Sequence, residues 1–293
     1  MFFKILNQSL SSKRPTGREI LRFIDNMSGG DIRRGLYFFN TFILSGNTDV
    51  DDMLNKEIKS EGYPVPFHYI IKSILLENSR HYSMSHSQIM NIFDVNPAVS
   101  NSHFVNLRIL DHLNKKINNY SMIGNGYVPL TAFLVDAQST NHSHDSIIDS
   151  LKKLALYGLI EFDNQSRKGY DTAEYIRITK TGVYHLDKLS KRVMYLDLMW
   201  GDTPISDKST INKLRKLINL EKYTNELEMT KKMFERIEYY LKYLEKMEKN
   251  EWSDFPQYQY STLSNEKFMQ NILKKYNENK TYILSRMTRS RAR

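Results

Sequence analysis

Apolar residues recur at three- and four-residue spacing through the first 80 residues of the chain, and short polar turns separate these periodic stretches. This spacing is typical of helices that bury one face. Glycine marks two of the interruptions, at the pair Gly29-Gly30 and at Gly46, where a helix can end. We predict helices over 16–27, 36–44, 50–57 and 66–77, and from them a helical bundle over residues 14–80.

The pattern changes from His103 onward, where helical and strand-like periodicity alternate. Ser143 is a good N-cap residue for the helix that follows, and Gly158 can close that helix. Two short runs of β-branched and aromatic residues come next and predict a hairpin around a polar loop at 163–173. The predicted elements are a helix over 103–117, an extended piece over 127–130, a helix through 133–135, a helix through 147–156 and strands over 159–162 and 174–178.

The C-terminal part is also predicted to be helical. A long helix over 183–200 ends at the Gly-Asp-Thr-Pro turn 201–204. Apolar residues then alternate at three- and four-residue spacing over 220–244, which favours a helix with one buried seam. Because this seam lasts only about three to four heptads, we favour burial within the same chain, while an oligomer contact through 220–244 is the alternative. The last residues are basic, and we interpret them as a solvated arm.

Together these patterns predict a mainly α fold, in which a helical bundle is followed by a helix-turn-helix domain with a small β-hairpin and by a helical extension. The predicted parts are a helical domain over 1–80, a linker over 81–102, a second domain with its following helix over 103–200 and a C-terminal helical region with a basic tail over 201–293.

Composition and charge narrow the class of partner. The chain has 42 Lys and Arg residues against 33 Asp and Glu, a net charge of +9 that favours polyanions such as nucleic acid. It has no cysteine, which excludes disulfides and thiolate metal sites. The apolar start at 1–6 is too short for a secretory signal, and no run approaches the roughly 20 apolar residues of a membrane span. We therefore expect a cytoplasmic protein without a membrane partner.

A motif with two arginines, Ser-Gly-Gly-Asp-Ile-Arg-Arg-Gly, occupies 28–35. A glycine bend followed by guanidinium groups at a helix start suits contact with phosphate. The motif resembles the second sensor motif of AAA+ ATPases, a Gly-Asp-x-Arg sequence that opens a helix of the small helical lid domain. This resemblance implies that Gly30, Asp31, Arg33 and Arg34 lie at a bound nucleotide. The alternative is an ordinary helix start, with Asp31 at the positive end of the helix dipole and two solvated arginines.

The phosphate-binding loop of an ATPase is not found in this sequence. Gly30 and Gly35 have the right separation, but Leu36-Tyr37 follows where Lys-Ser/Thr is needed. The apolar run that ends at Asp136 is similar to a magnesium-binding strand, but an alanine follows where a catalytic glutamate is usual. We expect no ATPase activity from the chain alone. ATP would bind only if a partner domain or chain supplies the P-loop.

The segment 103–182 resembles the winged helix family in the order, lengths and turns of its elements. In that family the third helix usually lies in the major groove, and the wing, here the loop 163–173, touches the DNA backbone. Asp145 and Asp149 on the third helix would repel phosphate, and contact with protein is the alternative role. The candidate nucleic-acid contacts are His144, Lys152 and Lys153 on the helix and Arg167, Lys168 and Tyr170 at the wing.

A helical lid followed by a winged helix resembles the C-terminal halves of replication-initiator-like and signalling AAA+ or STAND ATPases. The resemblance implies a nucleic-acid-associated, ATPase-derived binding module that lacks its own P-loop. Two other hypotheses remain, a stand-alone winged-helix DNA-binding regulator and a protein-interaction scaffold. We predict no catalytic residues and no metal site, since His142, His144 and Asp145 diverge within one turn and have no second ligand group nearby in the sequence.

Overall fold

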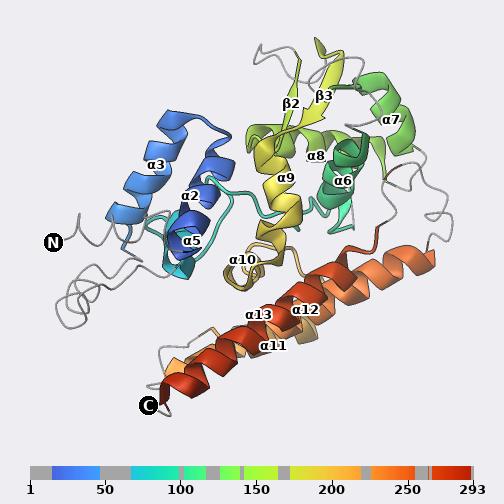
Figure 1. The fold of residues 1–293 in the computed structure, drawn as a ribbon. Coiled ribbons are helices and arrows are strands. Elements are labelled where there is room, and N and C mark those ends of the chain that lie inside the picture. Colours follow the sequence, from blue (N-terminus) through green and yellow to red (C-terminus); the bar gives the residue numbers. More distant parts are fainter. Residues whose placement is uncertain are drawn as a thin grey trace. The chain divides into compact units, whose positions relative to one another are not determined.

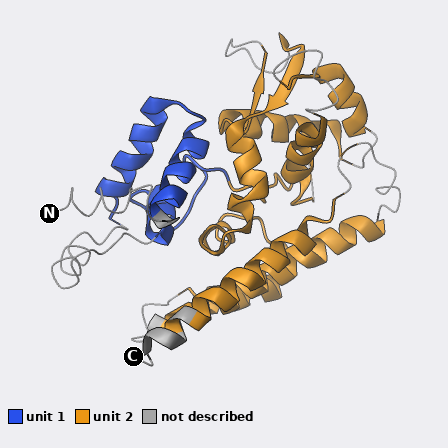
Figure 2. Ribbon diagram, viewed as in Figure 1, with its two compact units in different colours: residues 1–90 blue, residues 91–293 orange. Residues whose placement is uncertain are grey.

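The structure, a computed structural model, is mainly helical and contains a three-stranded antiparallel sheet (Figure 1). It describes residues 15–46, 67–98, 102–116, 126–138, 142–163, 172–218, 226–254, 263 and 266–291. The chain divides between Met90 and Asn91 into two compact units, here called unit 1 and unit 2 (Figure 2).

Three helices make up the described part of unit 1, namely α2 (Pro15–Ser28), α3 (Ile32–Leu44) and α5 (Phe67–Leu76). They pack together through apolar faces, and the rings of Phe23 and Phe67 meet edge to face with centroids 5.6 Å apart. Three of the four helices predicted for this region are thus confirmed. The fourth, predicted over 50–57, lies outside the described residues.

The segment predicted as a linker, 81–102, contributes to a packed core. Ile92 and Phe93 are fully buried in unit 2. The Ile92 amide donates a hydrogen bond of 2.8 Å to the Tyr195 hydroxyl, and the Asn91 side-chain amide donates to the Met199 carbonyl at 3.2 Å. The linker prediction is therefore wrong from Asn91 to Phe93, because apolar side chains and satisfied backbone groups fix these residues in unit 2.

The middle of unit 2 alternates helices with the small sheet. Its elements are α6 (Val105–Lys116), β1 (Val128–Pro129), α7 (Leu130–Gln138), α8 (His144–Leu156), β2 (Ile160–Phe162) and β3 (Tyr175–Ile178). Strand β3 lies between β1 and β2 and is antiparallel to both. Helix α8 begins where the Ser143 hydroxyl accepts the Ser146 amide at 3.1 Å, and the chain turns at Gly158 with φ of 69°. The predicted elements over 103–178 are confirmed in type and order.

The single long helix predicted over 183–200 is wrong. The chain forms α9 (Lys180–Asp187), a 3-10 turn (Leu189–Lys191) and α10 (Val193–Met199). The breaks fall at Lys188, with φ −124° and ψ −55°, and at Arg192, which is extended. Leu189 and Ser190 between them are buried, so tertiary packing outweighs the local helical preference here.

The C-terminal region of unit 2 consists of α11 (Lys208–Lys216), α12 (Glu226–Asp254) and α13 (Phe268–Arg291). Helices α12 and α13 form an antiparallel pair (Figure 1). At one end the Tyr276 hydroxyl donates to the Phe234 carbonyl at 3.2 Å. The basic C-terminal residues belong to α13 up to Arg291, so the prediction of an arm is wrong for that stretch.

The apolar seam predicted in 220–244 is used within the chain. Phe234, Ile237, Leu241 and Leu244 are buried in unit 2. Burial within the same chain is thereby confirmed for these four residues, so their side chains are not available for the predicted oligomer contact. Leu220 and Tyr223 lie outside the described residues.

A buried arginine joins the middle of unit 2 to its C-terminal helices. Arg108 on α6 is fully buried, and its Nε donates to Glu251 Oε1 on α12 at 3.1 Å. The guanidinium also lies over the Phe268 ring, with its carbon 5.6 Å from the ring centroid. His142 Nε2 lies 3.7 Å from the same Glu251 oxygen, and burial lowers the pKa of His142 to about 4. These contacts join α6 and the residue just before Ser143, the N-cap of α8, to the α12–α13 pair.

The start of α13 is capped from α12 by Glu248, which makes stability depend on pH. Its carboxylate accepts the Phe268 amide at 2.7 Å, and burial raises the pKa of Glu248 to about 7. Because the folded state holds this proton more tightly than the unfolded chain does, the Glu248 contribution to the free energy of unfolding falls as the pH rises from about 4.5 to about 7. Glu248→Gln keeps an acceptor oxygen and removes the titration. We expect this variant to be more stable than the wild type at pH 8, by up to about 3 kcal/mol, and to match it near pH 4.5.

Urea unfolding across this pH range measures the difference. The opposing titration of His142 is present in both proteins and cancels to first order. Glu248→Ala is the control, since it removes the cap and should be less stable than Glu248→Gln at every pH. A Glu248→Gln protein that is no more stable than the wild type at pH 8 would contradict the prediction.

Candidate functional site

The motif at 28–35 forms an exposed bend that leads into α3. Gly29 and Gly30 have φ of 64° and 86°, in the left-handed region that favours glycine. Asp31 caps α3, since its carboxylate accepts the amides of Arg33 at 2.7 Å and Arg34 at 3.3 Å. The predicted helix start is confirmed, and the aspartate is engaged by the backbone of its own helix.

The two arginines of the motif differ in their surroundings. Arg33 is exposed, and no ion pair joins it to another described residue of unit 1. Arg34 is half-buried, and its guanidinium carbon lies 5.5 Å from the centroid of the Phe38 ring. Burial lowers the pKa of Arg34, with Asp31 acting in the opposite direction. Of the two, Arg33 is the one whose charge is open to a ligand.

Apolar side chains surround Arg33 in the sequence of α3 and are also exposed. Ile32 is 78% exposed and Leu36 63% exposed. They lie four residues apart, so they share one face of the helix. Exposed apolar side chains next to an exposed guanidinium group are typical of a surface that contacts another domain.

On α8 the structure separates the predicted basic contacts into two kinds. His144 and Lys152 are exposed, as a contact with nucleic acid requires. Lys153 instead donates to Asp94 at 2.8 Å and lies 3.1 Å from Asp149. Burial lowers the pKa of Lys153, but these two carboxylates outweigh it and the net shift is upward. These carboxylates neutralise the charge of Lys153, which disfavours the phosphate contact predicted for it.

The predicted wing contacts Arg167, Lys168 and Tyr170 lie outside the described residues. The strands on either side of them are described. On β3, Arg177 pairs with Glu161 of β2, and its guanidinium carbon lies 4.6 Å from the centroid of the Tyr127 ring. This cation is therefore engaged within the sheet.

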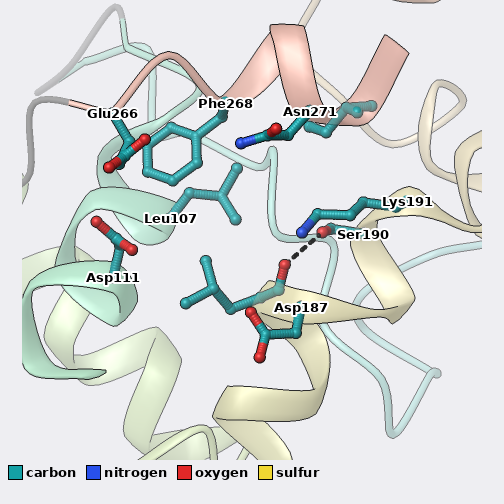
Figure 3. Close-up of a pocket in the computed structure, with 10 residues that line it drawn as sticks. Leu107, Asp111, Asp187, Ser190, Lys191, Glu266, Phe268 and Asn271 are labelled. Atoms are coloured by element: carbon teal, nitrogen blue, oxygen red, sulfur yellow. Dashed lines mark hydrogen bonds between the residues drawn. The ribbon is translucent and has the colours of Figure 1, made fainter. Parts of the chain in front are cut away.

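A pocket of about 250 Å³ lies between α6, the Leu189–Lys191 turn and α13 (Figure 3). Apolar side chains such as Phe268 line it together with Asp111, Asp187, Glu266 and Lys191, and Lys191 lies across the pocket from Asp111 and Glu266. Burial lowers the pKa of Lys191. Lys115 pairs with Asp111 at 2.9 Å and with Glu266 at 2.8 Å, so two of the three lining carboxylates are engaged, and the pocket has no excess of cations that would attract an anionic ligand.

No metal centre forms in the part of the chain that the structure describes. Searching these residues finds no group of three or more His, Asp or Glu side chains that could hold an ion. His142 is turned toward Glu251, whereas His144 is exposed. Within the same residues, no helix is long and apolar enough to cross a bilayer.

Comparison with models of protein families, with curated proteins and with solved structures found no match to this chain.

One basic helix was missed by the sequence analysis. Helix α11, Lys-Ser-Thr-Ile-Asn-Lys-Leu-Arg-Lys, has four basic residues and no acidic one. Its composition could have been noticed in the sequence, but its exposure and its setting against α12 depend on the fold. The four residues are Lys208, Lys213, Arg215 and Lys216, all exposed.

Proposed function

We propose that this chain is a nucleic-acid-associated, ATPase-derived binding module in which a winged helix domain contacts DNA and the preceding helical unit is a lid without its own P-loop. The observation that carries the proposal is the topology of unit 2. Three helices with a short strand between the first two lead into a hairpin, and the sheet has the order β1-β3-β2. This order of elements is the one expected of a winged helix, and it supports the proposal that α6, α7 and α8 are its three helices.

The position of α8 supports its assignment as the DNA-contacting helix. It directly precedes the β2–β3 hairpin, and its exposed residues include His144 and Lys152. The wing adds Arg167 and Lys168 from the sequence, and the net charge of +9 favours a polyanion. In this proposal the lysines and arginines neutralise backbone phosphates, and the sequence of the DNA contributes little to the affinity.

The lid assignment gives Arg33 a separate role. It is exposed beside a glycine bend, and its helix start is fixed by Asp31. We propose that Arg33 contacts a nucleotide phosphate when a partner domain or chain supplies the P-loop. The exposed Ile32 and Leu36 would then pack on that partner.

A second candidate function is contact with protein through the same domain. It is favoured by the charges of α8, where Asp145 is exposed and Lys153 is neutralised by Asp94. Because Lys153 is neutralised, α8 presents fewer available cations than a typical DNA-contacting surface has.

The test is duplex DNA binding measured as a function of salt. We expect the wild type to bind a labelled random-sequence duplex, and the triple variant Lys152→Gln, Arg167→Gln, Lys168→Gln to bind more weakly. Its slope of log affinity against log salt should fall by about 2–3, since each backbone contact contributes about 0.9. Fluorescence anisotropy over a salt series measures both quantities.

Two single variants serve as matched controls. Lys153→Gln and Arg33→Gln each remove a positive charge, but the first lies in an ion pair and the second is assigned to nucleotide. Neither should change the salt slope. A wild type that does not bind duplex DNA, or a triple variant with an unchanged slope, would leave protein contact as the better reading of this domain.

A further inference from the structure

Helix α11 presents a row of cations on one face. Lys208 lies seven residues before Arg215 and eight before Lys216, which is about two turns of helix, so the three side chains share a face. All three are exposed, and they span about 12 Å along the helix axis. The adjacent Lys213 points toward α12, where its Nζ lies 5.3 Å from the centroid of the Tyr239 ring.

The carboxylates near α11 are engaged elsewhere. Asp207 is the N-cap residue, and its oxygens accept the amides of Ser209 at 3.1 Å and Thr210 at 3.2 Å. No ion pair joins the four basic residues of α11 to another described residue of unit 2. Three carboxylates of α12 are paired with lysines of α12 or α13, in the pairs Glu235 with Lys232, Glu238 with Lys280 and Glu245 with Lys249.

Stabilisation of the helix itself does not account for this row. Basic residues in the last turn are favoured by the negative end of the helix dipole, which explains Arg215 and Lys216. Lys208 is in the first turn, where the positive end of the dipole opposes a cation. Its presence on the same face as the other two therefore points to a ligand that is negative along the length of the helix.

The backbone of α11 is held firmly enough to present these charges. Leu214 and Leu217 are buried against the rest of unit 2. The Leu217 carbonyl accepts from Arg236 Nη1 at 2.9 Å, and that guanidinium is itself bound to Asp197. Figure 1 places α11 beside α12, on the opposite side of unit 2 from the β2–β3 hairpin. The basic row is thus a fixed surface apart from the α8 surface.

We propose that the α11 face of Lys208, Arg215 and Lys216 is a second nucleic-acid surface, which binds the phosphodiester backbone without reading sequence. The choice of ligand rests on the proposed function, while the surface itself rests on the contacts above. Because the two surfaces lie on opposite sides of unit 2, a single duplex would contact both only if it bends around the unit, and the two contributions to the salt slope would then add.

The test uses the full chain and the triple variant Lys208→Gln, Arg215→Gln, Lys216→Gln. Binding to the random-sequence duplex should weaken, and the salt slope should fall by about 2–3. The matched control is Lys180→Gln, Lys188→Gln, Lys274→Gln, which removes three exposed lysines from other helices or turns and should keep the wild-type slope. Circular dichroism checks that both variants fold.

The outcomes separate this proposal from the proposed function. An unchanged slope in the α11 variant, together with a reduced slope in the variant of Lys152, Arg167 and Lys168, overturns the α11 surface alone. A reduced slope in the α11 variant alone supports α11 and overturns the α8 surface. An equal loss in the matched control means a general charge effect and overturns the α11 surface. If the wild type sediments with phosphatidylserine vesicles but does not bind duplex, both proposals are wrong.

Discussion

Replacing Asp197 with asparagine is expected to lower the free energy of unfolding by about 3–5 kcal/mol. Asp197 on α10 and Arg236 on α12 are both buried, and Arg236 Nη2 lies 2.7 Å from each carboxylate oxygen. The asparagine keeps the shape of the side chain and removes its charge. The guanidinium is then left in the core without its counter-charge, and removing one partner of a buried pair costs far more than the pair contributes.

Equilibrium unfolding in urea, followed by circular dichroism, measures this loss. The contrasting variant is Glu235→Gln, which breaks the pair with Lys232 on the surface of α12 and should cost less than about 1 kcal/mol. The double variant Asp197→Leu, Arg236→Met removes both charges and should recover part of the loss. An Asp197→Asn protein as stable as the wild type would mean that Arg236 does not depend on this carboxylate.

The same pair connects stability to the proposed α11 surface. Arg236 bridges Asp197 to the Leu217 carbonyl just after α11, so the charge at Asp197 holds the end of that helix indirectly. A variant that loosens this bridge lets α11 move relative to α12. We therefore expect Asp197→Asn to weaken binding to duplex DNA, although Asp197 is not part of the basic face of α11.

Local sequence patterns were sufficient for most of the fold of unit 2. The elements over 103–178 follow from hydrophobic periodicity with a serine N-cap and a glycine stop, and each of these signals acts within a few residues. The break at Lys188 and Arg192 was missed because no Pro or Gly marks it. It arises from packing, since Leu189 and Ser190 are buried and Tyr195 on the next helix bonds the Ile92 amide.

The candidate site shows the same limit. The exposed position of Arg33 and the cap formed by Asp31 follow from a short motif, and the motif was visible in the sequence. The neutralisation of Lys153 could not be predicted from the sequence, because its partner Asp94 is 59 residues away and comes from the segment predicted as a linker. The net charge of a helix face therefore cannot be predicted from sequence alone, because it also depends on ion pairs with residues far away in the chain.

Gly182→Ala is expected to destabilise unit 2 by about 3 kcal/mol, because α9 lies directly against the Leu159 carbonyl, just before β2, at this glycine. A Cβ atom at this position would lie 2.1 Å from the Leu159 carbonyl oxygen and 2.7 Å from the Ile178 side chain. Contacts this short force the backbone of α9 away from the sheet. The movement would also break the 3.0 Å bond between the Thr179 amide and the Leu159 carbonyl.

Gly35→Ala is the matched control for the change. Gly35 is also helical, in α3, but a Cβ there would meet Ile24 no closer than 3.7 Å, which is ordinary contact. Alanine has the higher helix propensity, so this variant should be neutral or more stable by about 0.5–1 kcal/mol. Thermal unfolding of the two variants beside the wild type makes the comparison. If both substitutions had the same small effect, the close approach of α9 to the Leu159 carbonyl would be wrong.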